Sequence, residues 1–401
     1  MTPRCLRRAA VLAGVMSLLL IASSAAEPAR SPIRIGSTLA LTGPLAGTAL
    51  LHKLSGEIFL EQLTEKGGLL GRPVEWVLLD DESRPEVTRT LYERLIRMDT
   101  VDLLIGPYAT GAILTAMSVA KRHGKLLVHN TFGIPHLAKS DRQFPIWAIG
   151  PDPARTVPGS LLDALAATGK PPRTIAIVTS TFPSVHFMSL GAREVAKQRG
   201  LREALYQEFE FGSREFGAIA ARVRDAKADF LWMGAIGLEG NLLLEALKRL
   251  DYAPPVHFYL YPAPGPLALV PEGRHALSST MFEEHPPFTA GPRAAEFVKR
   301  NRERAAKDGL PYGVAETQAA IAYAAWQVLE SAITATRSLD DAALTQWLRA
   351  HRVDAIIGRL RFDGPNNYGD DLSKIRQVRD GRWVVVWPKE SAAPAARLVV
   401  P

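Results

Sequence analysis

The sequence predicts an α/β protein made of two similar halves, each built around a doubly wound parallel sheet. The 401 residues are 47% hydrophobic and 22% charged, a composition typical of a globular chain long enough for two domains. Short runs rich in Val, Ile and Leu alternate with amphipathic stretches, as expected when helices cover both faces of parallel strands. The alternation restarts after Pro151-Asp152-Pro153, so the halves are expected to meet near residue 150.

In the first half, predicted strands alternate with predicted helices. Its apolar runs are short and lack a clean polar alternation, which predicts strands buried on both faces. The predicted strands are Ile33–Leu41, Val74–Leu79, Val101–Ile105 and Leu126–His129, and the predicted helices are Leu51–Lys66, Pro85–Arg97 and Gly111–Arg122.

The second half repeats this order of elements. Its predicted strands are Arg173–Thr179, Leu205–Glu210, Phe230–Met233 and Val256–Leu260, and its predicted helices are Ser184–Arg199, Arg214–Ala226 and Glu239–Leu250. Long helical patterns then return at Pro292–Lys307 and Val314–Thr336. The last predicted strands are Leu360–Phe362, Lys374–Val378 and Trp383–Trp387, with Asp380-Gly381 as a tight hairpin turn between the final two. Residues 391–401 are expected to form a loose tail.

The N-terminus has the pattern of a secretory signal peptide, residues 1–26. Three arginines precede an apolar run over residues 9–22, and small residues lead to Ala26. The run is too short to span a bilayer of about 30 Å. We therefore expect export with cleavage between Ala26 and Glu27. Cleavage would remove Cys5, the single cysteine, so no lipid-anchored form is expected.

Charge and motifs exclude several classes of function. The formal charge is +7, but Lys and Arg are scattered among acidic residues and do not alternate with aromatics, so no nucleic-acid partner is expected. The chain has no G-x-S-x-G, H-E-x-x-H or P-loop motif, and its nine His lack carboxylates at metal-ligand spacing. We expect no enzymatic activity, cofactor or metal. A periplasmic α/β hydrolase remains an alternative, and it would need Ser118 or Ser184 within hydrogen-bond reach of a histidine.

Loops at the ends of predicted strands carry the strongest functional signal. Open parallel sheets bind ligands at the carboxyl ends of their strands. Three such loops, Thr42–Thr48, Gly106–Gly111 and Asn130–Gly133, are rich in small and hydroxyl residues. The second runs directly into a helix, so the Thr110 hydroxyl and the first helical amides are expected to hold a carboxylate.

Several motifs together resemble the leucine/isoleucine/valine-binding-protein family, the type I periplasmic solute receptors of ATP-driven (ABC) importers. The resemblance runs from about Ile33 to Trp387. It is carried by Ile33–Thr48, the Gly-Gly-Leu-Leu-Gly-Arg-Pro run from Gly67, Val101–Thr115 with its Ile-Gly-Pro, Ile357-Gly358 with Arg361-Phe362-Asp363, and Gln377 to Trp387.

This resemblance implies two Rossmann-like lobes with parallel central sheets, joined by three crossovers. One lobe would comprise residues 32–150 and 284–357, and the other 151–283 and 358–390. The ligand would be trapped between the lobes and delivered to an ABC permease and its ATPase. The protein would act in the periplasm as a monomer. A ligand-sensing module of the same fold is the alternative within the family.

The resemblance also implies which residues face the ligand. Thr110 falls where the family has a Ser that binds the ligand's carboxylate, and Gly133 replaces a Thr in a second carboxylate loop. Thr48, Ser184 and Ile236 replace residues that are often aromatic. The full predicted ligand-binding set is Thr48, Tyr108, Ala109, Thr110, Asn130, Thr131, Phe132, Gly133, Ser184, Ile236 and Tyr261.

The family's acidic residue, which pairs with the ammonium of an amino acid, is missing from its expected place. It should follow Val256–Leu260, where this chain reads Tyr261-Pro262-Ala263. Glu239, Glu283 or Glu284 could substitute for it. The sequence therefore predicts a receptor for a small apolar or aromatic carboxylate, or for a branched-chain amino-acid-like ligand.

Overall fold

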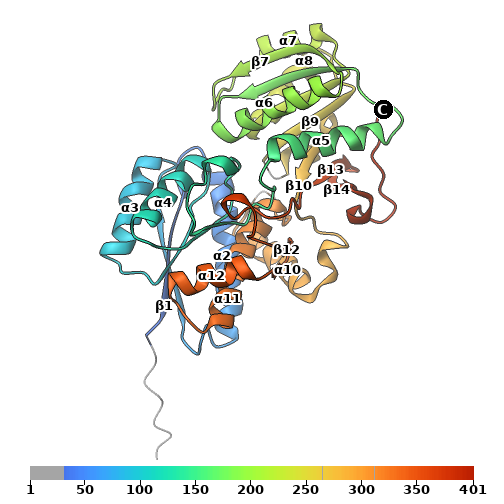
Figure 1. Ribbon diagram of the computed structural model, residues 1–401. Coiled ribbons are helices and arrows are strands. Elements are labelled where there is room, and N and C mark those ends of the chain that lie inside the picture. The colour runs from blue at the N-terminus through green and yellow to red at the C-terminus, as the bar shows by residue number, and fades with distance from the viewer. Residues whose placement is uncertain (1–30, 264, 311) are drawn as a thin grey trace, which may run out of the picture.

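The computed structural model describes residues 31–263, 265–310 and 312–401, and it has two α/β lobes (Figure 1). The predicted signal peptide and its cleavage site lie outside the described residues. The chain passes between the lobes three times: after the last strand of the first sheet, after the last parallel strand of the second sheet, and before the final hairpin. The predicted fold class is confirmed.

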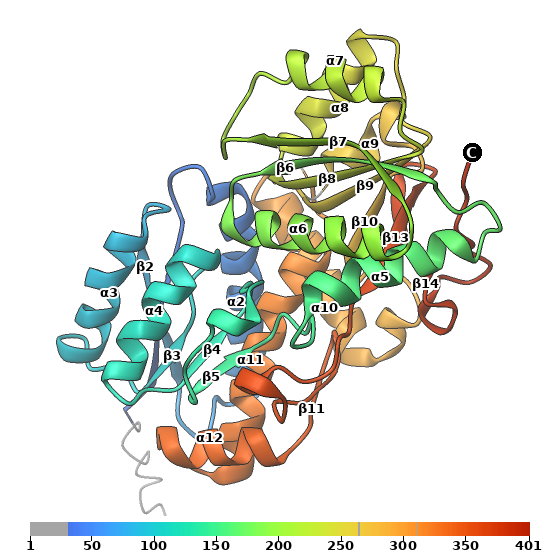
Figure 2. The ribbon, with the colours of Figure 1, turned by 45° about the horizontal axis from the view of Figure 1, so that its top comes forward.

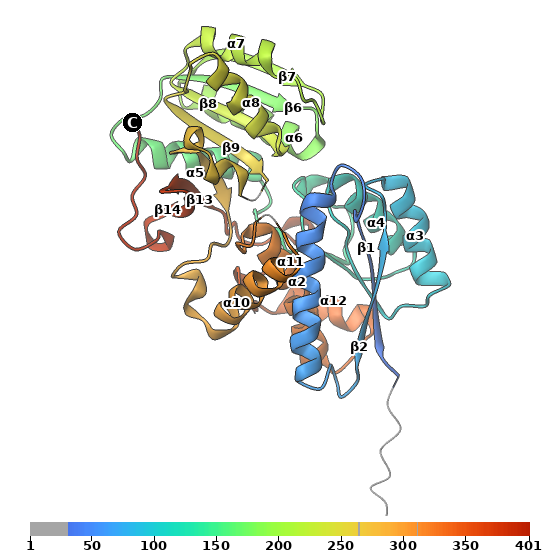
Figure 3. The same cartoon turned by 180° about the vertical axis from the view of Figure 1, so that it is seen from behind.

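The first lobe is built on a five-stranded parallel sheet with strand order β2-β1-β3-β4-β5. Its strands are β1 (Ile33–Leu39), β2 (Val74–Asp80), β3 (Leu103–Ile105), β4 (Leu127–His129) and β5 (Gln143–Pro145). Its helices are α2 (Ala46–Glu65), α3 (Pro85–Arg97), α4 (Thr110–Arg122), α10 (Pro292–Lys307), α11 (Thr317–Thr336) and α12 (Asp341–Ala350). Figure 1 shows α3 and α4 in front of the sheet. Figure 3, the view from the opposite side, shows α2 in front of it. Helices therefore cover both faces, which explains the unbroken apolar strands.

The second lobe is built on a seven-stranded sheet with strand order β14-β13-β10-β9-β8-β6-β7. The parallel strands are β6 (Thr174–Ser180), β7 (Arg202–Phe209), β8 (Phe230–Gly237), β9 (Val256–Pro262) and β10 (Leu277–Thr280); β13 (Lys374–Arg379) and β14 (Arg382–Trp387) form an antiparallel hairpin. Its helices are α5 (Pro153–Ala166), α6 (Pro183–Gln198), α7 (Gly217–Ala226), α8 (Glu239–Arg249) and α9 (Pro266–Leu269). Figure 2 shows α5 and α6 on one side of this sheet and α7 and α8 on the other.

Residues 358–372 pack with the first lobe, which corrects the predicted boundary at residue 358. Strand β12 (Gly358–Leu360) pairs with β11 (Val353–Ala355). Phe362 packs edge-on against Phe144, and the Tyr368 hydroxyl donates a hydrogen bond to the carbonyl of Phe132. The chain therefore returns to the second lobe close to β13, because these aromatic side chains are buried in the first core.

The C-terminal tail is docked rather than loose. The Gln377 side-chain amide accepts from the Val399 N–H and donates to the Val399 carbonyl, at 3.0 and 2.8 Å. Leu398 and Val400 pack against the core of the second lobe. The apolar residues near the end of the sequence were the signal for this docking.

A buried ion cluster joins the crossovers, and we call Arg376, Glu283 and Glu316 the hinge cluster. Arg376 lies on β13, Glu316 precedes α11, and Glu283 lies on the segment that leaves β10. One guanidinium nitrogen donates to Glu283 at 2.8 Å and to Glu316 at 2.5 Å, and all three side chains are no more than 4% exposed. Burial raises the pKa of Glu283, against the opposing charge of Arg376. Two carboxylates thus share one cation at the joint between the lobes.

Within the described ranges, no helix is long and apolar enough to cross a membrane.

Candidate ligand-binding cleft between the lobes

A pocket lies between the two lobes and encloses about 470 Å³ of space outside the protein atoms, part of it open solvent. Most of its lining residues lie at the carboxyl ends of parallel strands: in the last residues of β8 and β9, and in the segments that follow β3, β4 and β6. This is where open α/β sheets bind ligands. The lining residues are Thr48, Tyr108, Ala109, Thr110, Thr131, Gly133, Trp147, Phe182, Ser184, Ile236, Gly237, Tyr261, Pro262 and Gln318.

The structure brings nine of the eleven predicted site residues to this pocket and places two behind its wall. Asn130 is 3% exposed, and its side chain is hydrogen-bonded to His52. Phe132 is fully buried in the core of the first lobe. Sequence reasoning missed five lining residues. Three of them, Phe182, Gly237 and Pro262, are within two residues of predicted site residues in the sequence. The other two, Trp147 on a crossover and Gln318 at the start of α11, do not follow a predicted strand.

The lobes approach each other closely at Gly133. A Cβ atom on this glycine would lie 3.2 Å from Ser184 Cβ and 3.6 Å from the Tyr261 hydroxyl, both on the second lobe. Tyr261 also packs edge-on against Trp147, with ring centroids 5.5 Å apart. Aromatic rings from both lobes therefore line the pocket, and small residues lie where the lobes meet.

The β3–α4 loop supplies a corner suited to an anion. The Thr110 hydroxyl is buried and has no hydrogen-bond partner among the residues described. Thr110 begins α4, whose first-turn N–H groups lack intrahelical acceptors and carry the positive end of the helix dipole. Ala109 before it has φ +74°, and its N–H donates to the Thr131 hydroxyl at 3.2 Å. This strained turn aims the start of α4 at the pocket.

A hydrogen-bonded chain supports the first-lobe wall. The Asn130 amide nitrogen lies 3.0 Å from His52 Nδ1, and His52 Nε2 lies 3.0 Å from the Gln318 side-chain oxygen. Burial lowers the pKa of His52 to about 4, so the ring is neutral near pH 7. The His52 ring also contacts Tyr108, with centroids 5.0 Å apart. Gln318 is thus held by its oxygen at the edge of the pocket.

No acidic or basic side chain is among the described residues that line the pocket. Glu239 accepts hydrogen bonds from the N–H groups of Gly212 and Ile236, at 2.9 and 3.2 Å. Glu283 is paired with Arg376, and Glu284 accepts from Arg302. The three glutamates that could have replaced the family's acid are therefore engaged elsewhere.

Another acid, Asp371, acts on the pocket only through Tyr261. Burial raises the pKa of the Tyr261 phenol far above its usual range, and the charge of Asp371 adds to this rise. Asp371 itself accepts from the Thr156 hydroxyl and the Ser373 N–H. It does not line the pocket, so no carboxylate faces a bound ligand there.

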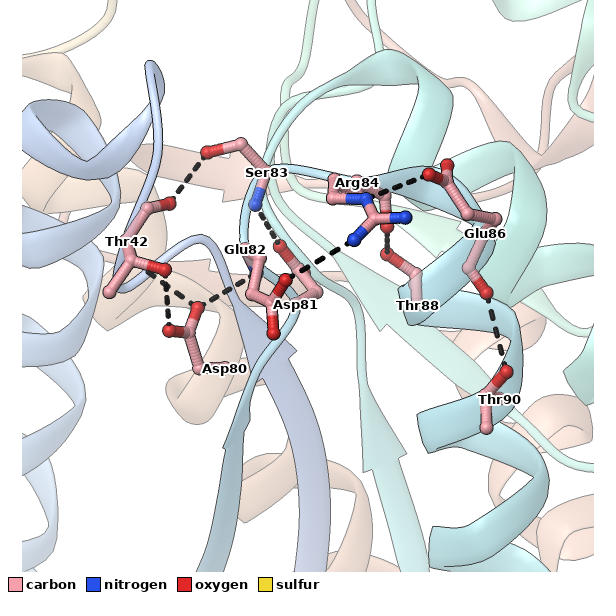
Figure 4. A network of polar contacts seen from close by, with 9 residues as sticks. All are labelled: Thr42, Asp80, Asp81, Glu82, Ser83, Arg84, Glu86, Thr88 and Thr90. Carbon is pink, nitrogen blue, oxygen red and sulfur yellow. Dashed lines mark hydrogen bonds and ion pairs between the residues drawn. The ribbon is translucent and has the colours of Figure 1, made fainter.

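A polar network holds the loop that leads to Thr48 (Figure 4). Asp80 accepts from the Thr42 N–H and hydroxyl and from the Glu82 N–H, at 3.2, 2.8 and 2.8 Å. Burial opposes ionisation of Asp80, but these hydrogen bonds outweigh it and hold the pKa below its usual value. Gly43, with φ +85°, has no room for a side chain because a Cβ would lie 2.6 Å from the Ser83 hydroxyl. The network fixes the start of α2, and with it the position of Thr48.

The hydrolase alternative finds no support in the geometry. Neither Ser118 nor Ser184 is hydrogen-bonded to a histidine in the part of the chain that the structure describes; Ser118 accepts from Arg122. In the same residues, no group of three or more His, Cys, Asp or Glu side chains could hold a metal ion.

Comparison with known proteins gives a consistent result over nearly the whole chain. The family model described as periplasmic binding protein matches residues 32–382. A Leu/Ile/Val-binding protein of Rhizobium johnstonii is 25% identical over 356 residues, covering 86% of this chain and 92% of the relative. A leucine-, isoleucine-, valine-, threonine- and alanine-binding protein of Pseudomonas aeruginosa is 22% identical, covering 84% and 87%. These relatives are binding proteins, not enzymes.

Solved structures share the fold. A leucine-binding protein of Thermotoga maritima superposes with a TM-score of 0.72 at 19% identity, covering 88% of this chain and 97% of that one. A solute-binding protein of an ABC transporter from R. palustris, in complex with benzoate, gives a TM-score of 0.73 at 17% identity, covering 92% and 99%. With its family match over residues 32–382, the chain belongs to the periplasmic binding protein family.

Proposed function

We propose that this protein is the periplasmic receptor of an ABC importer and binds a small apolar or aromatic carboxylate. The observation that carries the proposal is the polarity of the cleft. The anion corner at Thr110 and four aromatic rings line the same pocket, and no carboxylate lines it to pair with an ammonium. Burying an unpaired ammonium costs several kcal/mol, whereas a simple acid avoids that cost.

The ligand's carboxylate would accept hydrogen bonds from the Thr110 hydroxyl and the first amides of α4. Its apolar body would pack on Tyr108, Trp147, Phe182 and Tyr261. A ligand that touches both lobes stabilises the closed state over the open one, because only then are both sets of contacts made. Closure would mark the loaded receptor for a membrane permease. Two structural relatives, the R. palustris benzoate complex and a complex with 3,4-dihydroxybenzoic acid from the same genus, support this ligand class.

Matched pairs of ligands test the proposal. Titration calorimetry of the purified protein with leucine and 4-methylpentanoate, and with phenylalanine and 3-phenylpropanoate, compares skeletons that differ only in the ammonium. Each acid is expected to bind at least about tenfold more tightly than its amino acid, because the cost of several kcal/mol is removed. Benzoate should raise the melting temperature, since a ligand of the folded state stabilises it by mass action. Tight binding of leucine with no binding of 4-methylpentanoate would show the proposal to be wrong.

Replacing Thr110 by valine tests the anion corner. Losing a hydrogen bond to a charged carboxylate is expected to weaken binding of 4-methylpentanoate by about 1–3 kcal/mol, or about 5- to 150-fold. Thr115→Val is the matched control in the same helix, because the Thr115 hydroxyl donates to the backbone carbonyl of Gly111 and does not line the pocket. Equal affinities for the two variants by calorimetry would remove Thr110 from the binding site.

A further inference from the structure

We infer that Gln318 is a specificity determinant of the cleft, and that it donates a hydrogen bond to a second oxygen on the ligand besides its carboxylate. This inference rests on the proposed function and names a narrower ligand class: an apolar or aromatic acid that carries a keto or similar acceptor oxygen. Its basis is the directed chain from Asn130 through His52 to Gln318.

Burial gives the chain its rigidity. His52 is 2% exposed and Asn130 is 3% exposed, so neither can exchange its partner for water. Both ring nitrogens of His52 are engaged, each at 3.0 Å. Because the neutral ring carries one proton, one of its nitrogens accepts and the other donates.

The direction of the chain follows from the amide of Asn130. Its nitrogen faces His52 Nδ1, and its oxygen is the atom left without a partner. The reverse orientation would leave two buried N–H donors unpaired in place of one oxygen, which is the costlier arrangement. His52 Nδ1 therefore accepts, and Nε2 carries the proton and donates to the Gln318 oxygen.

With its oxygen bound to His52, Gln318 has its amide nitrogen free to donate a hydrogen bond to a ligand in the cleft. Gln318 is half-buried and lines the pocket, and its nitrogen makes no hydrogen bond within the described residues. Two other polar atoms of lining residues, the Thr110 hydroxyl and Trp147 Nε1, are buried without partners in those residues. All three can donate, and they come from three different segments of the first lobe and its crossover. A carboxylate bound at the start of α4 does not use all three donors. A second acceptor oxygen on the ligand would pair with a donor that the carboxylate leaves free.

A series of ligands on one skeleton gives the test. Leucine, 4-methylpentanoate and 4-methyl-2-oxopentanoate differ only in carrying an ammonium, hydrogen or keto oxygen beside the carboxylate. Calorimetry with the purified protein is expected to show the keto acid binding about 3- to 10-fold more tightly than the parent acid. That ratio corresponds to the free energy of one additional neutral hydrogen bond. In Gln318→Met, which keeps the length of the side chain without its polar atoms, the two acids should bind within about twofold of each other.

Gln318→Glu tests the hydrogen bond separately from the packing of the side chain, because it is expected to change which ligand is preferred. Its carboxylate would accept from His52 Nε2 and present an acceptor to the cleft, so the ratio of leucine affinity to keto-acid affinity should rise above that of Gln318→Met. Melting temperatures of the unliganded variants report whether each one folds.

The outcomes separate this inference from the proposed function. Equal binding of the keto and parent acids by the wild type, or an equal loss of both in Gln318→Met, would overturn the role of Gln318 and leave the carboxylate receptor standing. Binding of leucine with neither acid bound would overturn the proposed function and this inference with it.

Discussion

Arg376→Met is expected to lower the free energy of unfolding by about 3–5 kcal/mol, because it leaves two carboxylates buried without their cation. Arg376 is the guanidinium of the hinge cluster, where it contacts both Glu283 and Glu316, and it also lies 4.2 Å over the ring of Trp383. Urea unfolding followed by circular dichroism measures the change.

Neutralising the whole hinge cluster is the control for this prediction. The triple variant Glu283→Gln, Glu316→Gln and Arg376→Met has no buried charge left unpaired, and we expect it to recover most of the lost stability. If the triple variant is as unstable as Arg376→Met, the loss comes from packing at Trp383 rather than from unpaired charge. If Arg376→Met is as stable as the wild type, the cluster does not hold the crossovers.

Gly133→Val is expected to weaken binding of 4-methylpentanoate by about 5- to 150-fold, with little change in the melting temperature of the unliganded protein. Gly133 faces the second lobe, and a Cβ there would already lie 3.2 Å from Ser184 Cβ. The two further carbons of valine would act as a wedge between the lobes. Overpacking of this kind costs about 1–3 kcal/mol, and the open state escapes that cost.

A size exchange across the cleft tests whether the contact at Gly133 is the cause. Gly133→Ala adds one carbon on the first lobe, and Ser184→Gly removes the atom it would meet on the second. We expect the double variant to bind more tightly than the sum of the two single effects predicts, since residues in contact are not additive. Additive effects would mean that the lobes do not close at this contact.

Sequence patterns predicted elements well where local chemistry marks their ends. Helices α3 and α10 match their predicted bounds, Pro85–Arg97 and Pro292–Lys307, because each opens on a proline at its first turn and ends in basic residues. Helix α5 was missed, since the junction between the halves was placed at Pro151-Asp152-Pro153 and no element was predicted directly after it. Pro153 stands at the first position of this helix, and Pro158 lies inside it. Strand β10 was missed because three of its residues, Ser278, Ser279 and Thr280, are polar although the strand is central in the sheet.

Sequence reasoning could predict the residues of the candidate site that lie at the ends of strands, but not those that lie elsewhere. Tyr108 and Thr110 follow β3, and Tyr261 ends β9, so topology places them in the cleft. Gln318 lies 266 residues from its partner His52, and no local pattern connects the two. A contact of that kind depends on how α11 packs against α2, which is a property of the tertiary fold.

The two ends of the described chain lie on different lobes. Ser31 leads into the amino end of β1, whereas the cleft lies at the carboxyl ends of the strands. Pro401 ends the tail that is docked on the second lobe (Figures 1 and 3). Closure on a solute would therefore change the distance between the ends without any probe entering the binding site. Cys5, the single native thiol, lies in the predicted signal peptide, so cysteines introduced near the ends of the processed chain could carry a pair of dyes. Energy transfer between two such dyes would then report the concentration of the solute.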